Sequence, residues 1–336
     1  MVQERYPNIQ IRSKNELAKQ ISSFKLPVSD AMALIQDALD NFDNYWHDHP
    51  KQSEPEKDKW VRDASGTKLS KIHKLINARV LKPHDKKLPY FIFGGISGKN
   101  HKSAAFHLLG NKRKRVLLKL DIKRFYEQIS EARVRQFFIQ KCHCSEKGAK
   151  LLASLCCVPI GQKGTGGVYK TIGRGFAPSS RLAAWCNLDT FTKLEKLVKK
   201  ELRGKDPRIA IYVDDIGITA SRATNEEMIE LYNKIKPILM SDKNQTLPLN
   251  DSKTKIIHHS GEMYDINRKF LKRKGFEILG IQMNRNSLTP GTKTRWKLVN
   301  LKKEIEKRKS DSKNLKIRCK SVLRYKKYIE KDEAKV

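Results

Sequence analysis

Three aspartates stand at the ends of apolar segments in a chain that is otherwise rich in lysine and arginine. Asp121 follows the apolar run VLLKL, and Asp214 and Asp215 separate IAIYV from IGITA. A carboxylate at the end of a buried strand costs desolvation free energy unless a cation pairs with it, and adjacent carboxylates repel each other. Two-metal phosphoryl transfer requires such a set, because hard oxygen ligands bridge divalent ions about 3.5–4 Å apart. The alternative is a hairpin turn that carries two solvated acids, and the pattern itself leaves both open.

The balance of charge favours a polyanionic partner. The chain has 336 residues, with 70 lysines and arginines against 36 aspartates and glutamates, and a net charge of +34. This length suggests roughly two or three folding units. Such an excess of charge repels itself in a compact fold unless nucleic acid or an anionic membrane neutralises it. The sequence has no apolar run of about 18 residues, and its polar start does not fit a signal peptide. We therefore expect a cytoplasmic protein that binds nucleic acid and no membrane.

The cysteines and histidines do not suggest a structural metal or a disulfide framework. The 6 cysteines are scattered without repeated pairs, so we expect reduced thiols. The segment Cys142-His143-Cys144 lacks two further ligands at a spacing suited to zinc. The segment His47-Asp48-His49 is predicted to be a polar surface turn.

Helices and short strands alternate in the pattern expected for an α+β fold. Apolar spacing predicts helices over residues 14–46, 67–80, 131–157, 179–202 and 224–241, and a basic helical tail from residue 292. Short runs rich in branched residues predict a buried strand that ends at Asp121, a hairpin over 208–221 and a further strand over 276–284. Residues 47–59 and the glycine-rich residues 161–175 are predicted to be loops.

Five segments, in order, resemble the motifs of bacterial reverse transcriptases. LLKLDIKRFYEQI is similar to the first catalytic motif of that family, and YVDD at 212–215 is similar to the second. Between them, GRGFAPSSRLAAWCNLD resembles the motif usually written QGxPxSP, which a helix follows. LNDSKTKII resembles the lysine-bearing motif, and FEILGIQMN resembles the primer-grip region. The resemblance covers residues 60–300, and retrons and related phage-defence enzymes are the most similar groups.

The resemblance implies a right-hand polymerase with fingers, a palm built on an antiparallel sheet, and a short helical thumb. Residues 1–115 would form N-terminal helices and fingers, and residues 131–175 a fingers insertion. Residues 116–130 and 176–285 would form the palm. Residues 286–336 would form the thumb, whose interleaved aromatic and basic residues would track a duplex through its phosphates. A solvated helix face is the alternative for this tail.

The resemblance also implies a metal site and a nucleotide site. Asp121, Asp214 and Asp215, with the backbone carbonyl of Ile122, would bind two Mg²⁺ ions, with Mn²⁺ as a substitute. Tyr126 would stack under the incoming sugar and exclude a 2′-hydroxyl; its alternative is a place in the core beside Phe125.

Other expected nucleotide contacts lie in the fingers and in the lysine-bearing motif. Gly175 would let the backbone approach the nucleotide. Arg174 stands where the family usually has glutamine, which puts ordinary handling of dNTPs in question. Ser179 would cap the helix that follows.

Three lysines and one arginine are the remaining candidates for triphosphate contacts. Arg62, with Lys59 beside it, would be the fingers cation that grips the triphosphate. Lys253 would donate a proton near the pyrophosphate, and Lys255 is its rival for that role.

The function implied is an RNA-directed DNA polymerase that copies a structured non-coding RNA into DNA, in a retron-like system of bacterial defence against phages. Its partners would be dNTPs, the RNA template, the cDNA product and an effector protein. ILG stands at 278–280 where retrons commonly have VTG, so other defence-associated enzymes stay open, including ones that make untemplated or protein-primed DNA. An RNA-binding scaffold on a polymerase fold without chemistry is the alternative of another class.

Overall fold

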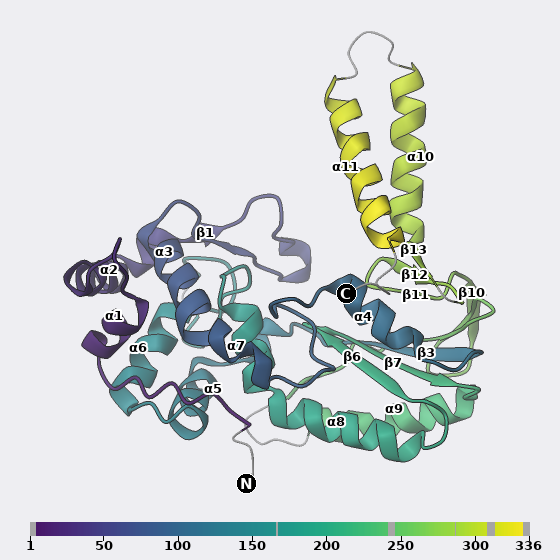
Figure 1. The fold of residues 1–336 in the computed structure, drawn as a ribbon, viewed down its shortest axis with the longest axis horizontal. Helices are drawn as coiled ribbons and strands as arrows, with labels where there is room; N and C mark the ends of the chain where they lie inside the picture. The colour runs from purple at the N-terminus through teal and green to yellow at the C-terminus, as the bar shows by residue number, and fades with distance from the viewer. Residues whose placement is uncertain (1–4, 166, 241–245, 286, 308–312, 332–336) are drawn as a thin grey trace. The chain divides into compact units, whose positions relative to one another are not determined.

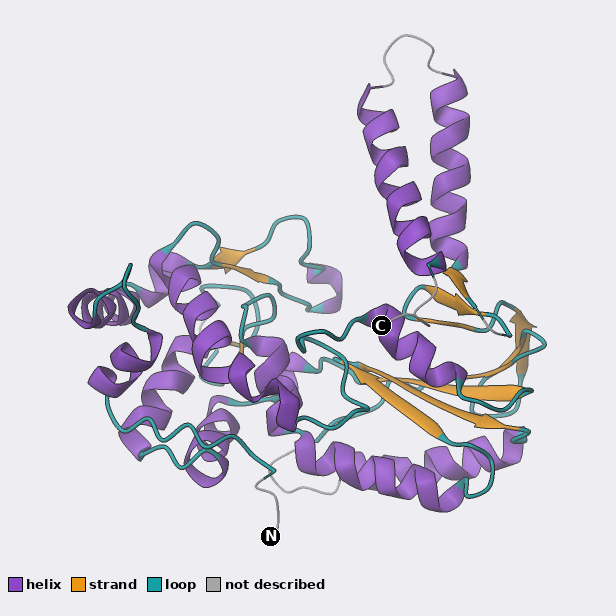
Figure 2. Ribbon diagram, viewed as in Figure 1, coloured by secondary structure: helices purple, strands orange, loops and turns teal. Residues whose placement is uncertain are grey.

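Antiparallel sheet and helices are combined in one chain (Figure 1, Figure 2), which confirms the predicted α+β class. The computed structural model describes residues 5–165, 167–240, 246–285, 287–307 and 313–331. Residues 286, 308–312 and 332–336 of the predicted thumb, and residue 241 of the predicted helix 224–241, lie outside this description. The chain forms two compact units. The first comprises Met1–Gly98, Lys123–Thr192 and Ile238–Pro248, and the second comprises Lys99–Ile122, Lys193–Pro237 and Leu249–Val336.

The second unit contains a six-stranded antiparallel sheet in the order β10-β9-β8-β3-β7-β6. Its strands are β3 (Arg115–Asp121), β6 (Arg208–Tyr212), β7 (Asp215–Ser221), β8 (Lys255–His258), β9 (Glu262–Tyr264) and β10 (Phe270–Arg273). β3 pairs with β7 on one side and with β8 on the other, and most of its residues are buried. The predicted strand that ends at Asp121 and the predicted hairpin over 208–221 are therefore confirmed.

Helices and a small sheet complete the second unit. α4 (His101–Leu109) packs against β6 and β7. A three-stranded sheet is formed by β11 (Glu277–Ile278), β12 (Ile281–Met283) and β13 (Leu288–Pro290). The basic tail forms α10 (Thr292–Lys307) and α11 (Lys313–Glu330), which pack through a small core of Leu301, Cys319 and Val322. Trp296 on α10 and Tyr328 on α11 are 62% and 43% exposed, whereas Tyr325 stacks on His101.

The first unit is mainly helical. Its helices are α1 (Lys14–Ile21), α2 (Val28–Asp40), α3 (Lys68–Leu75), α5 (Glu131–Gln136), α6 (Glu146–Cys156) and α7 (Ser179–Cys186). Two-stranded sheets pair β1 (His47–Asp48) with β2 (Arg62–Asp63), and β4 (Cys157–Pro159) with β5 (Lys170–Ile172). Side chains of Ser13, Thr67, Ser130 and Ser145 accept backbone hydrogen bonds at the starts of α1, α3, α5 and α6. Such caps satisfy N–H groups that the first helical turn leaves unpaired.

The remaining helices follow the predicted ranges with local breaks. α8 (Leu188–Glu201) is separated from α7 by Asn187, and α9 (Asn225–Met240) agrees with the predicted helix. Short turns of other helix types are found at Phe42–Tyr45, Pro55–Lys57, Ile76–Leu81, Lys82–Lys87, Tyr126–Gln128 and Phe137–Lys141.

Five local predictions were wrong. The predicted loop over 161–175 contains β5, which pairs with β4. The single helix predicted over 14–46 is broken between α1 and α2, where Ser23 and Leu26 bond to each other. The strand predicted over 276–284 is the hairpin of β11 and β12, because Leu279 and Gly280 turn with φ of 54° and 74°. His47 and Asp48 form β1 instead of a surface turn. Ser179 does not cap α7; its hydroxyl donates to the Gly173 carbonyl at 2.7 Å.

The sequence raised two further points, the state of the cysteines and the presence of a membrane-spanning helix. All six cysteines lie in described residues and are free thiols. Burial raises the pKa of the Cys156 and Cys186 thiols to about 12, so these two are poor nucleophiles. In the part of the chain that the structure describes, no helix has the length and apolar character that crossing a membrane demands.

Candidate active site

A two-residue turn between β6 and β7 carries the adjacent aspartates. Tyr212 and Asp215 pair across the hairpin, and Val213 and Asp214 form its tip. Val213 has φ 59°, a left-handed conformation that costs a residue with a side chain about 1–2 kcal/mol. The turn is fixed to the end of β3, because the Ile122 amide donates to the Asp214 carbonyl at 3.0 Å. Strain of this kind persists where the surroundings determine the backbone, and it concentrates at functional sites.

Asp121 and Asp215 lie side by side at the same end of the sheet. They are register partners on β3 and β7, and their side chains are 14% and 27% exposed. Lys253 places its Nζ 3.2 Å from both carboxylate oxygens of Asp121. Lys119 places its Nζ 3.5 Å from Oδ1 of Asp215. The two carboxylates therefore face two ammonium groups, of which Lys119 was missed in the sequence although it stands two residues before Asp121 on one face of β3.

The segment between α9 and β8 positions Lys253. The Asn250 amide donates to the Asp121 carbonyl at 2.8 Å, and the Lys253 amide donates to the Asn250 carbonyl at 3.0 Å. Lys255 lies on β8 as the register partner of Lys119. Lys119, Asp121, Lys253 and Lys255 line one cleft of about 560 Å³. The structure thus brings Lys253 onto Asp121 and keeps Lys255 on the neighbouring strand.

The electrostatics of Asp215 suit a site that takes up a cation. Burial raises the pKa of its carboxyl above the ordinary value; Lys119 opposes this, and the nearby Asp121 charge adds to it. Among the described residues, no three His, Cys, Asp or Glu side chains are arranged as a complete metal-ligand group. The two in-register carboxylates nonetheless offer the hard oxygen donors that Mg²⁺ prefers. Their donor chemistry fits this ion.

Asp215→Asn should raise the melting temperature in the absence of divalent ions at about pH 8. A raised carboxyl pKa means that the folded protein binds this proton more tightly than the unfolded chain does. The associated stability is present below the ordinary pKa and is lost as pH rises through the folded value. The variant has no carboxyl to ionise at this position and so does not lose this stability. The difference in melting temperature between the variant and the natural protein should therefore shrink as pH falls toward about 4. Thermal melts in EDTA across this range measure the effect, and a variant less stable than the natural protein at high pH would refute it.

The first unit holds the remaining predicted site residues, with Tyr126 in a partly exposed position. Its hydroxyl lies 3.0 Å from Oγ of Ser180, and the Arg174 guanidinium lies 5.1 Å from the ring centroid. Phe125 is 1% exposed and stacks on Phe191, so it is the neighbour that belongs to the core.

Arg174 and Gly175 bind other parts of the first unit. Nε and Nη2 of Arg174 donate to the two carboxylate oxygens of Glu127 at 3.2 and 2.9 Å. Gly175 has φ 102°, and a Cβ there would lie 2.5 Å from the Arg62 carbonyl oxygen. The close backbone approach that requires glycine is therefore made to Arg62, on β2.

Arg62 is buried, with 5% of its surface exposed. It pairs with Asp48, donates to the Pro159 and Gly161 carbonyls, and lies 5.0 Å from the centroid of the Trp46 ring. Its side chain thus ties β1 to the glycine-rich loop. A grip on a triphosphate stays a prediction, and it would require the guanidinium to leave these partners.

Comparisons with known proteins agree with the resemblance that the motifs carry. A family model described as reverse transcriptase (RNA-dependent DNA polymerase) matches residues 50–283. The retron Ec48 reverse transcriptase of Escherichia coli is 26% identical in an alignment 202 residues long, which covers 56% of this chain and 44% of that protein. The match therefore covers less than half of that relative's length. The family match includes Asp121, Asp214, Asp215 and Lys253.

Proposed function

We propose, from the premise that the chain belongs to the reverse transcriptase (RNA-dependent DNA polymerase) family, that it copies a structured non-coding RNA into DNA at Asp121, Asp214 and Asp215. The observation that supports this most is the register pair of Asp121 and Asp215 beside a strained turn that carries Asp214. The net charge of +34 supports a nucleic-acid substrate. The similarity to a retron reverse transcriptase supports a retron-like enzyme. Defence against phages, with an effector protein as partner, is the role that we propose for it.

The three carboxylates, with the Ile122 carbonyl, would hold two Mg²⁺ ions. Bound there, Mg²⁺, or Mn²⁺ in its place, would activate a primer hydroxyl and neutralise charge on the leaving pyrophosphate. Lys253, whose Nζ lies 3.2 Å from Oδ1 of Asp121, would leave that carboxylate and hold a proton close to the pyrophosphate. Arg174 would keep Tyr126 and Glu127 in place, and Gly175 would fix the backbone beside them.

The architecture proposed is that of a right hand. The six-stranded sheet would be the palm, and the pair α10 and α11 the thumb. The helical segments before residue 116, together with residues 131–175, would be the fingers. The exposed aromatic and basic residues of α10 support contact with a duplex.

A catalytically silent RNA-binding scaffold is the second candidate. The pairing of Lys253 with Asp121 and of Lys119 with Asp215 favours it, because both carboxylates then have a cation without any metal. The experiment is to incubate the pure protein and its copurified RNA with Mg²⁺ and labelled dNTPs, and to sequence the product. DNA complementary to the RNA supports the proposal, whereas no product under any template condition supports the scaffold. Product without a matching template would indicate untemplated or protein-primed synthesis.

Tyr126→Val should raise the use of rNTPs relative to dNTPs by about tenfold to a hundredfold. The proposed ring under the sugar excludes a 2′-hydroxyl by contact, and a clash of this kind is worth about 1–3 kcal/mol. Tyr126→Phe is the matched control, because it keeps the ring and removes the hydroxyl that lies 3.0 Å from Oγ of Ser180. The ratio of kcat/KM for dGTP and GTP measures the effect. Unchanged discrimination in the valine variant would remove Tyr126 from the nucleotide site.

A further inference from the structure

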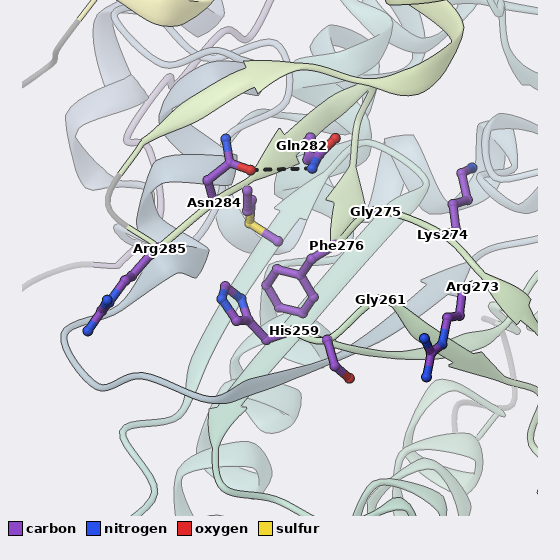
Figure 3. A pocket seen from close by; sticks show the side chains of 11 residues that line it. His259, Gly261, Arg273, Lys274, Gly275, Phe276, Gln282, Asn284 and Arg285 are labelled. Atoms are coloured by element: carbon purple, nitrogen blue, oxygen red, sulfur yellow. Dashed lines mark hydrogen bonds between the residues drawn. The ribbon is translucent and has the colours of Figure 1, made fainter.

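Two adjoining clefts of the second unit share His259 and Arg285 and form one basic surface. The larger, of about 890 Å³, is also lined by Lys112, Arg113, Lys114, Lys205 and Arg222. The smaller, of about 420 Å³, adds Arg273 and Lys274 (Figure 3). No aspartate or glutamate is among the described residues that line either cleft. We refer to the surface as the basic end cleft.

The larger part of the basic end cleft lies at the opposite end of the sheet from the carboxylates. β3 begins directly after Lys114 and ends at Asp121, and β7 begins at Asp215 and ends directly before Arg222. A strand of seven residues spans about 20 Å. The larger cleft is thus separate from the carboxylates and shares no lining residue with the cleft that contains Asp121, whereas Lys274 lines both that cleft and the smaller one.

Much of its positive charge is not compensated within the described protein. Lys205 pairs with Glu227, and Arg273 lies 3.5 Å from Glu262. Asp206 follows Lys205 directly in the sequence, but its carboxylate pairs with the buried Arg115, with Nη1 of Arg115 2.8 Å from Oδ2 of Asp206. Among the described residues, the exposed side chains of Arg113, Lys114 and Arg222 form no ion pair with an acid. Clustered like charges at a cleft attract a polyanion.

Two of these basic residues have a strained backbone conformation. Lys114 and Arg222 have φ of 56° and 54°, and the Arg222 amide donates to the Lys114 carbonyl at 2.8 Å. Each left-handed residue costs about 1–2 kcal/mol where glycine would cost little. Both are basic residues at the mouth of one cleft, which is where strain retained for binding is expected.

We propose that the basic end cleft binds the phosphate backbone of a base-paired nucleic-acid stem. The inference rests on the proposed function, since a structured RNA and its DNA copy would both offer such a stem to the enzyme. Single-stranded binding sites stack unpaired bases on aromatic rings. The ring of His259 already packs edge to face on Phe276, with centroids 5.7 Å apart, as their positions in Figure 3 illustrate. The described residues that line the cleft are therefore suited to contact phosphates through lysine and arginine.

The test is the salt dependence of stem binding in the variant Arg113→Gln, Lys114→Gln, Arg222→Gln. The probes are an RNA hairpin and a DNA hairpin of one sequence, each of about 24 base pairs, titrated between about 0.05 and 0.3 M KCl. The matched control is Lys193→Gln, Lys196→Gln, Lys200→Gln on α8, which removes the same charge from exposed positions of the second unit. Extension of a short primer–template by dNTPs is measured in parallel.

For at least one hairpin, the cleft variant should bind about tenfold or more weakly at 0.1 M KCl, with a log–log salt slope shallower by about 2–3. If only the RNA hairpin or only the DNA hairpin binds more weakly to the cleft variant, that result identifies which nucleic acid supplies the stem. Short primer–template extension should stay within about twofold of the natural protein, since three exposed changes far from the carboxylates leave that site intact. A slope equal to that of the natural protein for both hairpins, or an equal loss in the control, overturns the proposal. If the natural protein extends no primer, the proposed function fails, and the hairpin titration still decides on the cleft.

Discussion

Asp214→Ala combined with Asp215→Ala should lower dNTP incorporation by about 10³-fold or more while RNA binding stays within about twofold. Charge stabilisation by bound divalent ions supplies several kcal/mol to phosphoryl transfer, and each 1.36 kcal/mol is tenfold in rate. The double change removes the carboxylate in register with Asp121 and the one at the turn. RNA affinity depends on the many basic residues, which the change leaves in place. Single-turnover extension and filter binding measure the two properties.

Asp30→Ala with Asp40→Ala is a matched control for that experiment. Both aspartates are exposed on α2 of the first unit, so their removal changes the net charge by the same amount and leaves every residue of the hairpin in place. The control should extend primers like the natural protein. Incorporation that survives in the hairpin double variant would end the assignment of chemistry to this site.

Arg62→Ala should lower the free energy of unfolding by about 3–5 kcal/mol, the usual cost of removing one partner from a buried ion pair. The side chains of Arg62 and Asp48 are 4% and 15% exposed, so little solvent is available to replace the lost partner. The Pro159 and Gly161 carbonyls lose a donor as well. Chemical denaturation and thermal melting of the natural and variant proteins measure the change.

The same variant separates the two roles of Arg62. If the guanidinium mainly ties β1 to the glycine-rich loop, stability falls and Arg62→Lys restores it only in part, because one ammonium cannot serve the acceptors that a planar guanidinium serves. If it mainly grips the triphosphate, KM for dNTPs rises while stability stays near that of the natural protein.

The central strand and the catalytic hairpin could be predicted because their signals are local. Branched apolar runs that end in acids specify buried strands, and two such runs around a dipeptide specify a hairpin. The register of Asp121 with Asp215 then follows from pairing two strands of seven residues that share one end. The family match confirms the polymerase resemblance, while the role of each site residue stays a prediction.

Other features could not be predicted because their causes lie far apart in the sequence. The Arg62 side chain was expected to face a triphosphate, yet its partners are 14 and 97 or more residues away. Glu127 determines the position of Arg174 across 47 residues. The turn at Leu279 depends on a left-handed conformation that leucine rarely adopts, so its sequence gives no signal.

The central claim is that Asp121, Asp214 and Asp215 hold the divalent ions of a polymerase. A crystal structure with primer, RNA template, an incoming dNTP and Mg²⁺ tests it directly. We expect metal ions between these carboxylates and the triphosphate, with the Lys253 ammonium withdrawn from Asp121 toward the phosphates. Metal ions and triphosphate bound elsewhere, with Lys253 still against Asp121, would contradict it.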